Sequence, residues 1–118
     1  MAELPTLSEI EQRYAQLEGQ VLRTPTVQAT SAKLADVLGF DLFLKLELFQ
    51  HTGTFKARGA LSVISTLTNA QKANGITAVS AGNHAIAASW AARKAGISAK
   101  VVMTRTANPL RIERSKAE

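Results

Sequence analysis

Residues 47–60 have the sequence ELFQHTGTFKARGA and join a predicted strand to a predicted helix. Leucines alternate with other residues over 41–47, which is the pattern of a strand. Apolar residues then recur at helical spacing, which predicts a helix that starts near Phe55 and ends before Asn74. The segment between these two elements is a tight turn, and Lys56 lies just after it, at the start of the helix.

Lys56 occupies a position where a positive charge is unfavourable. A helix N-terminus carries a partial positive charge, and Arg58, two residues later, is expected to add to it. Both effects favour the neutral amine of Lys56, which is a nucleophile towards carbonyl groups. The backbone amides of the same turn can also hold an anion. The alternative is an ordinary solvated lysine, which is the commoner case for this residue type.

The composition predicts a folded protein of 118 residues, with 46% hydrophobic and 19% charged residues. The absence of cysteine excludes disulfides, zinc–thiolate sites and cysteine nucleophiles, and it fits a cytoplasmic protein. Residues 1–6 lack the pattern of a signal peptide, and no apolar run is long enough to span a bilayer. We therefore expect a cytoplasmic protein with no membrane partner.

The net charge of +5 raises the question of nucleic-acid binding. The basic residues are scattered along the chain, and glutamates dilute the arginines near its C-terminal end. The chain has four Phe, one Tyr and one Trp without basic residues interleaved among them, so a base-stacking platform is not expected. No nucleic-acid partner is therefore predicted.

Strands and helices alternate along the rest of the chain. Thr6 and Glu9 have the spacing of a capping box, and the run over 76–80 is apolar enough for a buried parallel strand. The alternation after residue 40 predicts an α/β fold with parallel strands. The elements predicted outside residues 41–74 are a helix from Thr6 to Gly19, a helix from about Thr30 or Ser31 to Leu38, a strand over 76–80, a helix to about Ala95, a strand over 99–103 and a helix from Pro109 onward.

A second tight turn follows the strand over 76–80 and has the sequence Ser80-Ala81-Gly82-Asn83-His84. Open α/β sheets bind ligands beyond the carboxyl ends of their strands, so the two turns are expected to face one crevice. The second turn offers backbone amides for a carboxylate or a phosphate, and Gly82 permits close approach or a positive φ. Asn83 is a candidate ligand contact or a helix cap, and His84 is a candidate general base or a histidine that caps or packs.

Other kinds of site find little support in the sequence. The chain contains no GxGxxG motif, no Walker loop, no paired-carboxylate spacing and no GxSxG elbow. His51 has no partner visible in the sequence and is assigned to a loop. Two histidines in separate loops do not make a metal signature, so no metal is predicted.

Residues 52–60 and 80–85 together resemble the two signatures of fold-type II pyridoxal-phosphate enzymes, in the threonine/serine dehydratase and serine racemase branch. The resemblance extends from about Thr6 to the end of the chain. It implies an α/β fold with a parallel sheet and flanking helices, similar to the tryptophan synthase β-subunit and incomplete here. It further implies that residues 1–75 are the N-terminal part of the large cofactor-binding domain and that residues 76–118 begin a smaller, truncated domain.

The resemblance also implies roles for single residues. Lys56 would form a Schiff base with the aldehyde of pyridoxal 5′-phosphate, Phe55 would pack beside the pyridine ring, and Asn83 would bind the ring hydroxyl. The substrate carboxylate would be held, largely by backbone amides, by Ser80, Ala81, Gly82, Asn83 and His84. Lys56 would then remove the α-proton of a small hydroxy amino acid, and loss of the β-hydroxyl would lead to a keto acid and ammonia. A homo-oligomer is implied for the full-length form.

Three features depart from this family pattern. Ala81 stands where racemases of the branch carry an acid/base serine, and Ile86 stands where the branch usually has glutamine. The glycine-rich phosphate loop and the partner of the pyridine nitrogen are not found in these 118 residues.

The leading hypothesis is a threonine/serine ammonia-lyase. The alternatives are a non-catalytic fragment or pseudoenzyme module, and, among enzymes, a serine racemase or hydroxyaspartate dehydratase. Cysteine synthase and threonine synthase chemistry fits the residues around the lysine less well.

Overall fold

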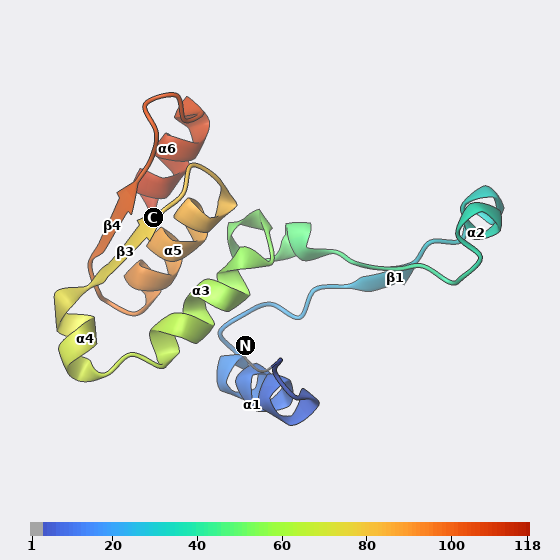
Figure 1. Ribbon diagram of the computed structural model, residues 1–118, viewed down its shortest axis with the longest axis horizontal. Coiled ribbons are helices and arrows are strands. Elements are labelled where there is room, and N and C mark those ends of the chain that lie inside the picture. Colours follow the sequence, from blue (N-terminus) through green and yellow to red (C-terminus); the bar gives the residue numbers. More distant parts are fainter. Residues whose placement is uncertain (1–3) are drawn as a thin grey trace.

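The computed structural model describes residues 4–118 (Figure 1). Residues 1–3, part of the segment judged to lack a signal peptide, lie outside this range. The helices are α1 (Leu7–Leu17), α2 (Ala32–Leu38), α3 (Lys56–Ser65), α4 (Asn69–Asn74), α5 (Asn83–Lys94) and α6 (Pro109–Ala117), with the short 3-10 helices η1 (Glu47–Phe49) and η2 (His51–Gly53). The strands are β1 (Thr26–Gln28), β2 (Phe43–Lys45), β3 (Ile76–Val79) and β4 (Ala99–Val102).

Strands β3 and β4 form a parallel pair, as the sequence predicts. Their register runs from Ile76 opposite Ala99 to Val79 opposite Val102. Helix α5 connects the two strands, and α3 and α6 pack against α5 (Figure 1). Parallel strands joined by a long helical crossover are the unit from which α/β folds are built. The predicted α/β class, with a parallel sheet and flanking helices, is confirmed.

Strands β1 and β2 form a separate antiparallel pair that extends away from this body, with α2 at its far end (Figure 1). The strand predicted over 41–47 is longer than the one observed. The ladder ends at the pair Thr26–Lys45, because the next residue on the β1 side is Pro25, which has no N–H to donate. The chain then turns into η1, so Glu47 leaves the strand direction and lies near α3.

The single helix predicted between Phe55 and Asn74 is wrong, because the structure divides it into α3 and α4. The hydroxyl of Thr66 donates to the carbonyl of Val63 at 2.7 Å, a local bond that competes with helix continuation. Thr68 then starts α4 with a capping box, in which its Oγ1 accepts from the N–H of Gln71 at 3.2 Å. The domain boundary predicted after residue 75 falls between α4 and β3 and stays a prediction.

The buried core lies mainly between α3 and α5. Alanines supply much of it, which lets the two helix backbones approach closely. Its members are Leu17, Ala57, Ala60, Leu61, Ile64, Ala87, Trp90, Ala91 and Ala92. This packing fixes the two helices side by side (Figure 1), and each of them begins in one of the predicted functional turns. The core therefore determines where Lys56 and Asn83 lie.

Candidate active site

The turn before Lys56 is held by the buried side chain of Gln50. Its Oε1 accepts from the backbone N–H groups of Leu22, at 2.9 Å, and His51, at 3.0 Å. Its Nε2 donates to the carbonyl of Leu22 at 2.8 Å. One side chain thus ties the turn to a segment 28 residues earlier in the chain. A primary amide suits this position, because it offers both a donor and an acceptor.

Thr52 gives the same turn an unusual backbone. Its φ is 64°, in the left-handed region that residues with a side chain rarely adopt. Its Oγ1 is buried and has no hydrogen-bond partner in residues 4–118. Backbone strain and unpaired buried hydroxyls are found at functional sites more often than elsewhere. The backbone conformation of the turn is therefore set by the contacts around it and not by the conformational preference of Thr52.

Lys56 is the first residue of α3, as its position after the turn predicts. Its side chain is exposed, and its Nζ lies 5.0 Å from the centroid of the Phe55 ring. Its backbone N–H donates to Thr54 Oγ1 at 3.3 Å, which satisfies one of the free donors at the helix start. The amine of Lys56 therefore stands at the end of a helix, beside an aromatic face and open to a ligand.

The positive charge of Arg58, which was expected to act on Lys56, is paired with a carboxylate in the structure. Arg58 makes a two-bond ion pair with Glu47, from Nε to Oε2 at 2.9 Å and from Nη2 to Oε1 at 2.8 Å. This guanidinium is the main cause that lowers the pKa of Glu47 to about 2, and the Thr24 hydroxyl adds to it. Arg58 also donates to the carbonyl of Leu22 at 3.0 Å. Its role in the structure is to fix η1 against α3.

The second turn runs from Ser80 into the start of α5. Ser80 Oγ accepts from the backbone N–H of Gly82 at 3.2 Å. Gly82 has a φ of −129°, so the turn does not use the positive φ that glycine permits. A Cβ on Gly82 would meet only Ser80 Oγ, at 4.0 Å, so the space before the helix is open. Asn83 is exposed, and its Oδ1 accepts from Nη1 of Arg111 in α6.

A cleft of about 560 Å³ lies between α3, β3 and the first turn of α5. It brings together Phe55, Lys56 and His84 from the two predicted turns. Ser80, Ala81, Gly82 and Asn83 do not line it. The other lining residues are mostly apolar and are Gly59, Ala60, Val63, Ile64, Ile76, Thr77, Ala78 and Ala88. The cleft combines one amine, one imidazole and one exposed aromatic ring on otherwise apolar walls, which is the usual character of a small-molecule site.

Three contacts at this site were missed by the sequence analysis. The ring of His51, assigned to a loop without a partner, stacks on Trp90 of α5 with centroids 4.9 Å apart. Arg111 reaches Asn83, and Nη2 of Arg114 lies 3.5 Å from the carbonyl oxygen of Thr52. The two arginines appear in the sequence only as part of a basic C-terminal segment. No local spacing could have paired residues that lie 28 and 62 positions apart.

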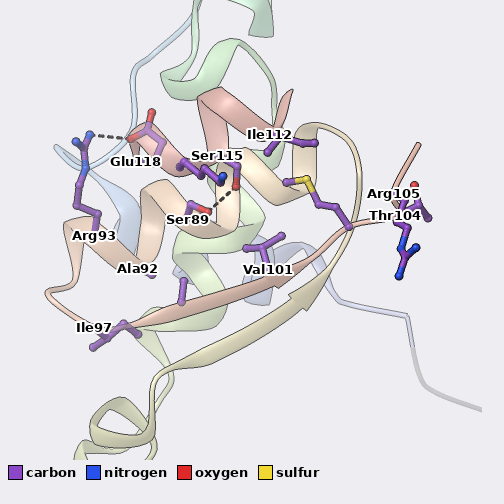
Figure 2. Close-up of a pocket in the computed structure, with 13 residues that line it drawn as sticks. Ser89, Ala92, Arg93, Ile97, Val101, Thr104, Arg105, Ile112, Ser115 and Glu118 are labelled. Carbon is purple, nitrogen blue, oxygen red and sulfur yellow. Dashed lines mark hydrogen bonds and ion pairs between the residues drawn. The ribbon is translucent and has the colours of Figure 1, made fainter. Parts of the chain in front are cut away.

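A second cavity, of about 620 Å³, lies between α5, β4 and α6 (Figure 2). Figure 2 shows the Ser89 and Ser115 hydroxyls bonded to each other, at 2.9 Å, and Arg93 paired with Glu118, at 2.7 Å. None of the predicted site residues lines this cavity. It is therefore distinct from the cleft that contains Lys56.

Residues 4–118 contain no group of three or more His, Cys, Asp or Glu side chains placed to hold a metal ion. None of their helices has the length and apolar character needed to cross a bilayer.

Comparison with known proteins gives consistent matches. The family described as "Pyridoxal-phosphate dependent enzyme" matches residues 17–118. The phenylserine dehydratase of Ralstonia pickettii is 48% identical over 109 residues, which are 92% of this chain and 33% of that protein. A catabolic L-threonine dehydratase of Staphylococcus aureus is 42% identical over 106 residues, which are 90% of this chain and 30% of that protein.

Solved structures agree with these relatives. Maize serine racemase matches with a TM-score of 0.86 and 35% identity, over 98% of this chain and 34% of that one. The threonine deaminase of T.th. matches with a TM-score of 0.78 and 38% identity, over 96% of this chain and 34% of that one. The chain thus spans about a third of the length of the relatives that it matches.

Proposed function

The chain belongs to the family of pyridoxal-phosphate-dependent enzymes, and from that premise we propose that it carries the lysine-bearing part of an ammonia-lyase. The substrates would be hydroxy amino acids of the L-threonine and L-serine type, and the products 2-keto acids and ammonia. The observation that carries this proposal is the position of Lys56, at the start of α3 and in a cleft beside Phe55 and His84. The names of two relatives, a phenylserine dehydratase and a threonine dehydratase, support the reaction class.

The residues of the cleft fit the ring end of pyridoxal phosphate. A pyridine ring is flat and aromatic, and the exposed ring of Phe55 together with the apolar walls of α3 and β3 offers it a matching surface. The amine of Lys56 opens into the same cleft, so Lys56 would be the residue that holds the cofactor through its aldehyde. When bound, the cofactor supplies an electron sink for the carbanion character that develops at the substrate α-carbon.

Lys56 would perform two tasks. Its Nζ would attach the cofactor covalently, which requires an accessible amine, and the exposed side chain at the head of α3 provides one. After release, the same Nζ would accept the α-proton of the substrate, as a general base within reach of the reacting carbon. Loss of that proton would then allow the β-hydroxyl to leave.

The second turn would hold the substrate carboxylate. The N–H groups of Asn83 and His84 lie in the first turn of α5, where backbone donors have no partner within the helix. The positive end of the α5 dipole favours an anion at the same place. Ser80 Oγ is bonded to the N–H of Gly82, so its proposed role is to keep the turn in shape. Asn83 would contact the ring hydroxyl.

Ala81 supports a lyase rather than a racemase. Racemisation needs a group on the second face of the substrate that returns the proton, and a methyl side chain can neither donate nor accept one. We expect the full-length enzyme to be a homo-oligomer, as the sequence resemblance implies, and to be cytoplasmic, as the composition suggests.

A keto-acid assay tests the proposed activity. We would use a version of the protein at the length of its relatives, loaded with pyridoxal phosphate, and offer it L-threonine, L-serine and hydroxyaspartate. Keto acid is expected from at least one of them, with Lys56→Ala inactive and Lys100→Ala, on the exposed strand β4, unaffected. The absence of keto acid from all three would contradict the lyase assignment. Conversion of L-serine to D-serine without keto acid would instead support a racemase.

A further inference from the structure

Helix α6 is attached to α5 by buried serines. Ser115 Oγ and Ser89 Oγ lie 2.9 Å apart, as drawn in Figure 2, and Ser115 Oγ also donates to the carbonyl of Ala85 at 3.4 Å. Both serines are buried, at 8% exposure. A hydroxyl pair of this kind fixes the register of one helix on another, because a slip would leave buried polar atoms unpaired.

This register places Arg111 beside the start of α5. Arg111 precedes Ser115 by four residues, which is about one helical turn. It is half-buried, and its Nη1 donates to Oδ1 of Asn83, the first residue of α5. The contact joins the fixed helix α6 to the turn that would hold the substrate.

Arginine imposes an orientation on the carboxamide of Asn83. A guanidinium carries only donors, so only the oxygen of the amide can face it. The NH₂ group of Asn83 must then point to the other side, where it can donate to an acceptor oxygen. A solvent-exposed asparagine without such a partner could turn its amide either way.

The charge of Arg111 is not taken up by a carboxylate. In residues 4–118 the two ion pairs are Arg58–Glu47 and Arg93–Glu118. An unpaired guanidinium next to Asn83 strengthens the donor character of its NH₂ group, because hydrogen bonds polarise one another along a chain. The combination suits an acceptor oxygen with negative charge.

We propose that Arg111 is a positioning residue, which fixes the Asn83 carboxamide so that its NH₂ group donates to the ring oxygen of pyridoxal phosphate. This inference rests on the function proposed above. Arg111 acts only through Asn83 and touches neither cofactor nor substrate. Its effect should therefore appear in cofactor affinity and in the absorbance of the bound cofactor, and it should vanish when Asn83 is removed.

The test compares Arg111→Gln with Arg111→Lys in the version at the length of its relatives. Lysine keeps a donor-only side chain, whereas glutamine can also accept a hydrogen bond and so lets the Asn83 amide turn around. We expect Arg111→Gln to weaken pyridoxal-phosphate binding about tenfold, the size expected for a lost charge-assisted hydrogen bond, and to shift the cofactor absorbance band. Arg111→Lys should restore most of the affinity and the parent band.

Two controls separate positioning from a general loss of structure. Lys116→Gln changes an exposed charge on the same helix and should leave the dissociation constant and the band unchanged. In an Asn83→Ala background, Arg111→Gln should change the dissociation constant by less than about twofold, because a residue that acts through a partner has no effect without it. Thermal melts show whether each variant folds. If Arg111→Gln does not fold, Arg111→Leu takes its place, and it should weaken pyridoxal-phosphate binding by about the same factor.

The outcomes are distinguishable. Equal affinity and band in the parent and in Arg111→Gln, or additive effects in the double variant, would overturn the positioning role and leave the proposed function intact. The absence of any bound-cofactor band in the parent would overturn the proposed function, and the inference with it.

Discussion

Lys56 and Asn83 are the first residues of two helices, α3 and α5, whose alanine-rich faces pack against each other. The separation of the two turns is therefore set by the helix–helix core and not by the turns themselves. Replacement of one of these alanines by a larger residue would therefore push the starts of the two helices apart.

Ala91→Leu tests the dependence on this core. Ala91 is fully buried between α3 and α5, so three extra carbons must displace its neighbours. We expect a loss of about 1–3 kcal/mol in the free energy of unfolding, measured by urea titration. Ala95→Leu is the matched control, because Ala95 is exposed at the end of the same helix and should cost little. Equal losses at the two positions would argue against a close-packed interface.

Glu47 should make stability depend on pH in acid. Arg58 holds the pKa of the Glu47 carboxyl at about 2, below the ordinary value of 4.5. The unfolded chain thus binds a proton that the folded chain does not, so stability is fully present above about pH 4.5 and is lost as pH falls towards 2. Denaturant titrations from pH 5 to about 2 should show a shallower slope for Glu47→Gln than for the parent.

Glu113→Gln, on the exposed side of α6, serves as the control for that series. It should keep the pH slope of the parent. If Glu47→Gln retained the full slope as well, the Arg58–Glu47 pair would not be the source of the acid sensitivity.

Gly75→Ala should be markedly destabilising. Gly75 has a φ of 75°, and a Cβ there would lie 2.6 Å from the backbone oxygen of Ser98. Gly96 has a similar φ of 67°, but a Cβ there would meet nothing within 4 Å. Gly96→Ala should therefore cost about 1 kcal/mol for the left-handed backbone alone, and Gly75→Ala clearly more, in the free energy of unfolding. Similar losses of stability in the two variants would contradict the close approach of Gly75 to the backbone of Ser98.

His51→Ala should loosen the first turn. Loss of its stacking on Trp90 is expected to cost about 1 kcal/mol of stability. Trp90 is the one tryptophan in the sequence, so urea unfolding followed by its fluorescence reports this region directly. His84→Ala changes the other histidine, which is exposed in the cleft, and should leave both stability and fluorescence close to those of the parent. An emission spectrum unchanged in His51→Ala would contradict the stacking.

Local patterns predicted the elements that lead into the site. The capping box at Thr6, the strand that starts at Ile76 and the helix that begins at Pro109 are found where the sequence places them. The break after Ser65 could have been found locally as well, because Thr68 and Gln71 have the spacing of a capping box. The helical spacing of the apolar residues does not show this break, so the pattern predicts one helix where the structure has α3 and α4.

Contacts across the fold could not be predicted in the same way. Arg58 is paired with Glu47, and Asn83 accepts a hydrogen bond from Arg111, and neither pairing follows from a helical or strand period. Arg111 meets Asn83 because α6 packs on α5, and Arg58 meets Glu47 because η1 lies against α3. A single sequence does not carry this information locally. Lys56 is found at the start of α3, where the sequence places it, whereas the pairing of Arg58 with Glu47 has no signal in the sequence pattern.

The identity of the lysine that binds the cofactor tests the assignment of Lys56 most directly. Pyridoxal phosphate would be added to this chain and to a version at the length of its relatives, the adduct reduced with borohydride, and the labelled lysine mapped by peptide mass spectrometry. We expect label on Lys56 in the longer version and its loss in Lys56→Arg, with Lys45 and Lys72 unlabelled. Stoichiometric label on another lysine, with Lys56 unmodified, would contradict this assignment.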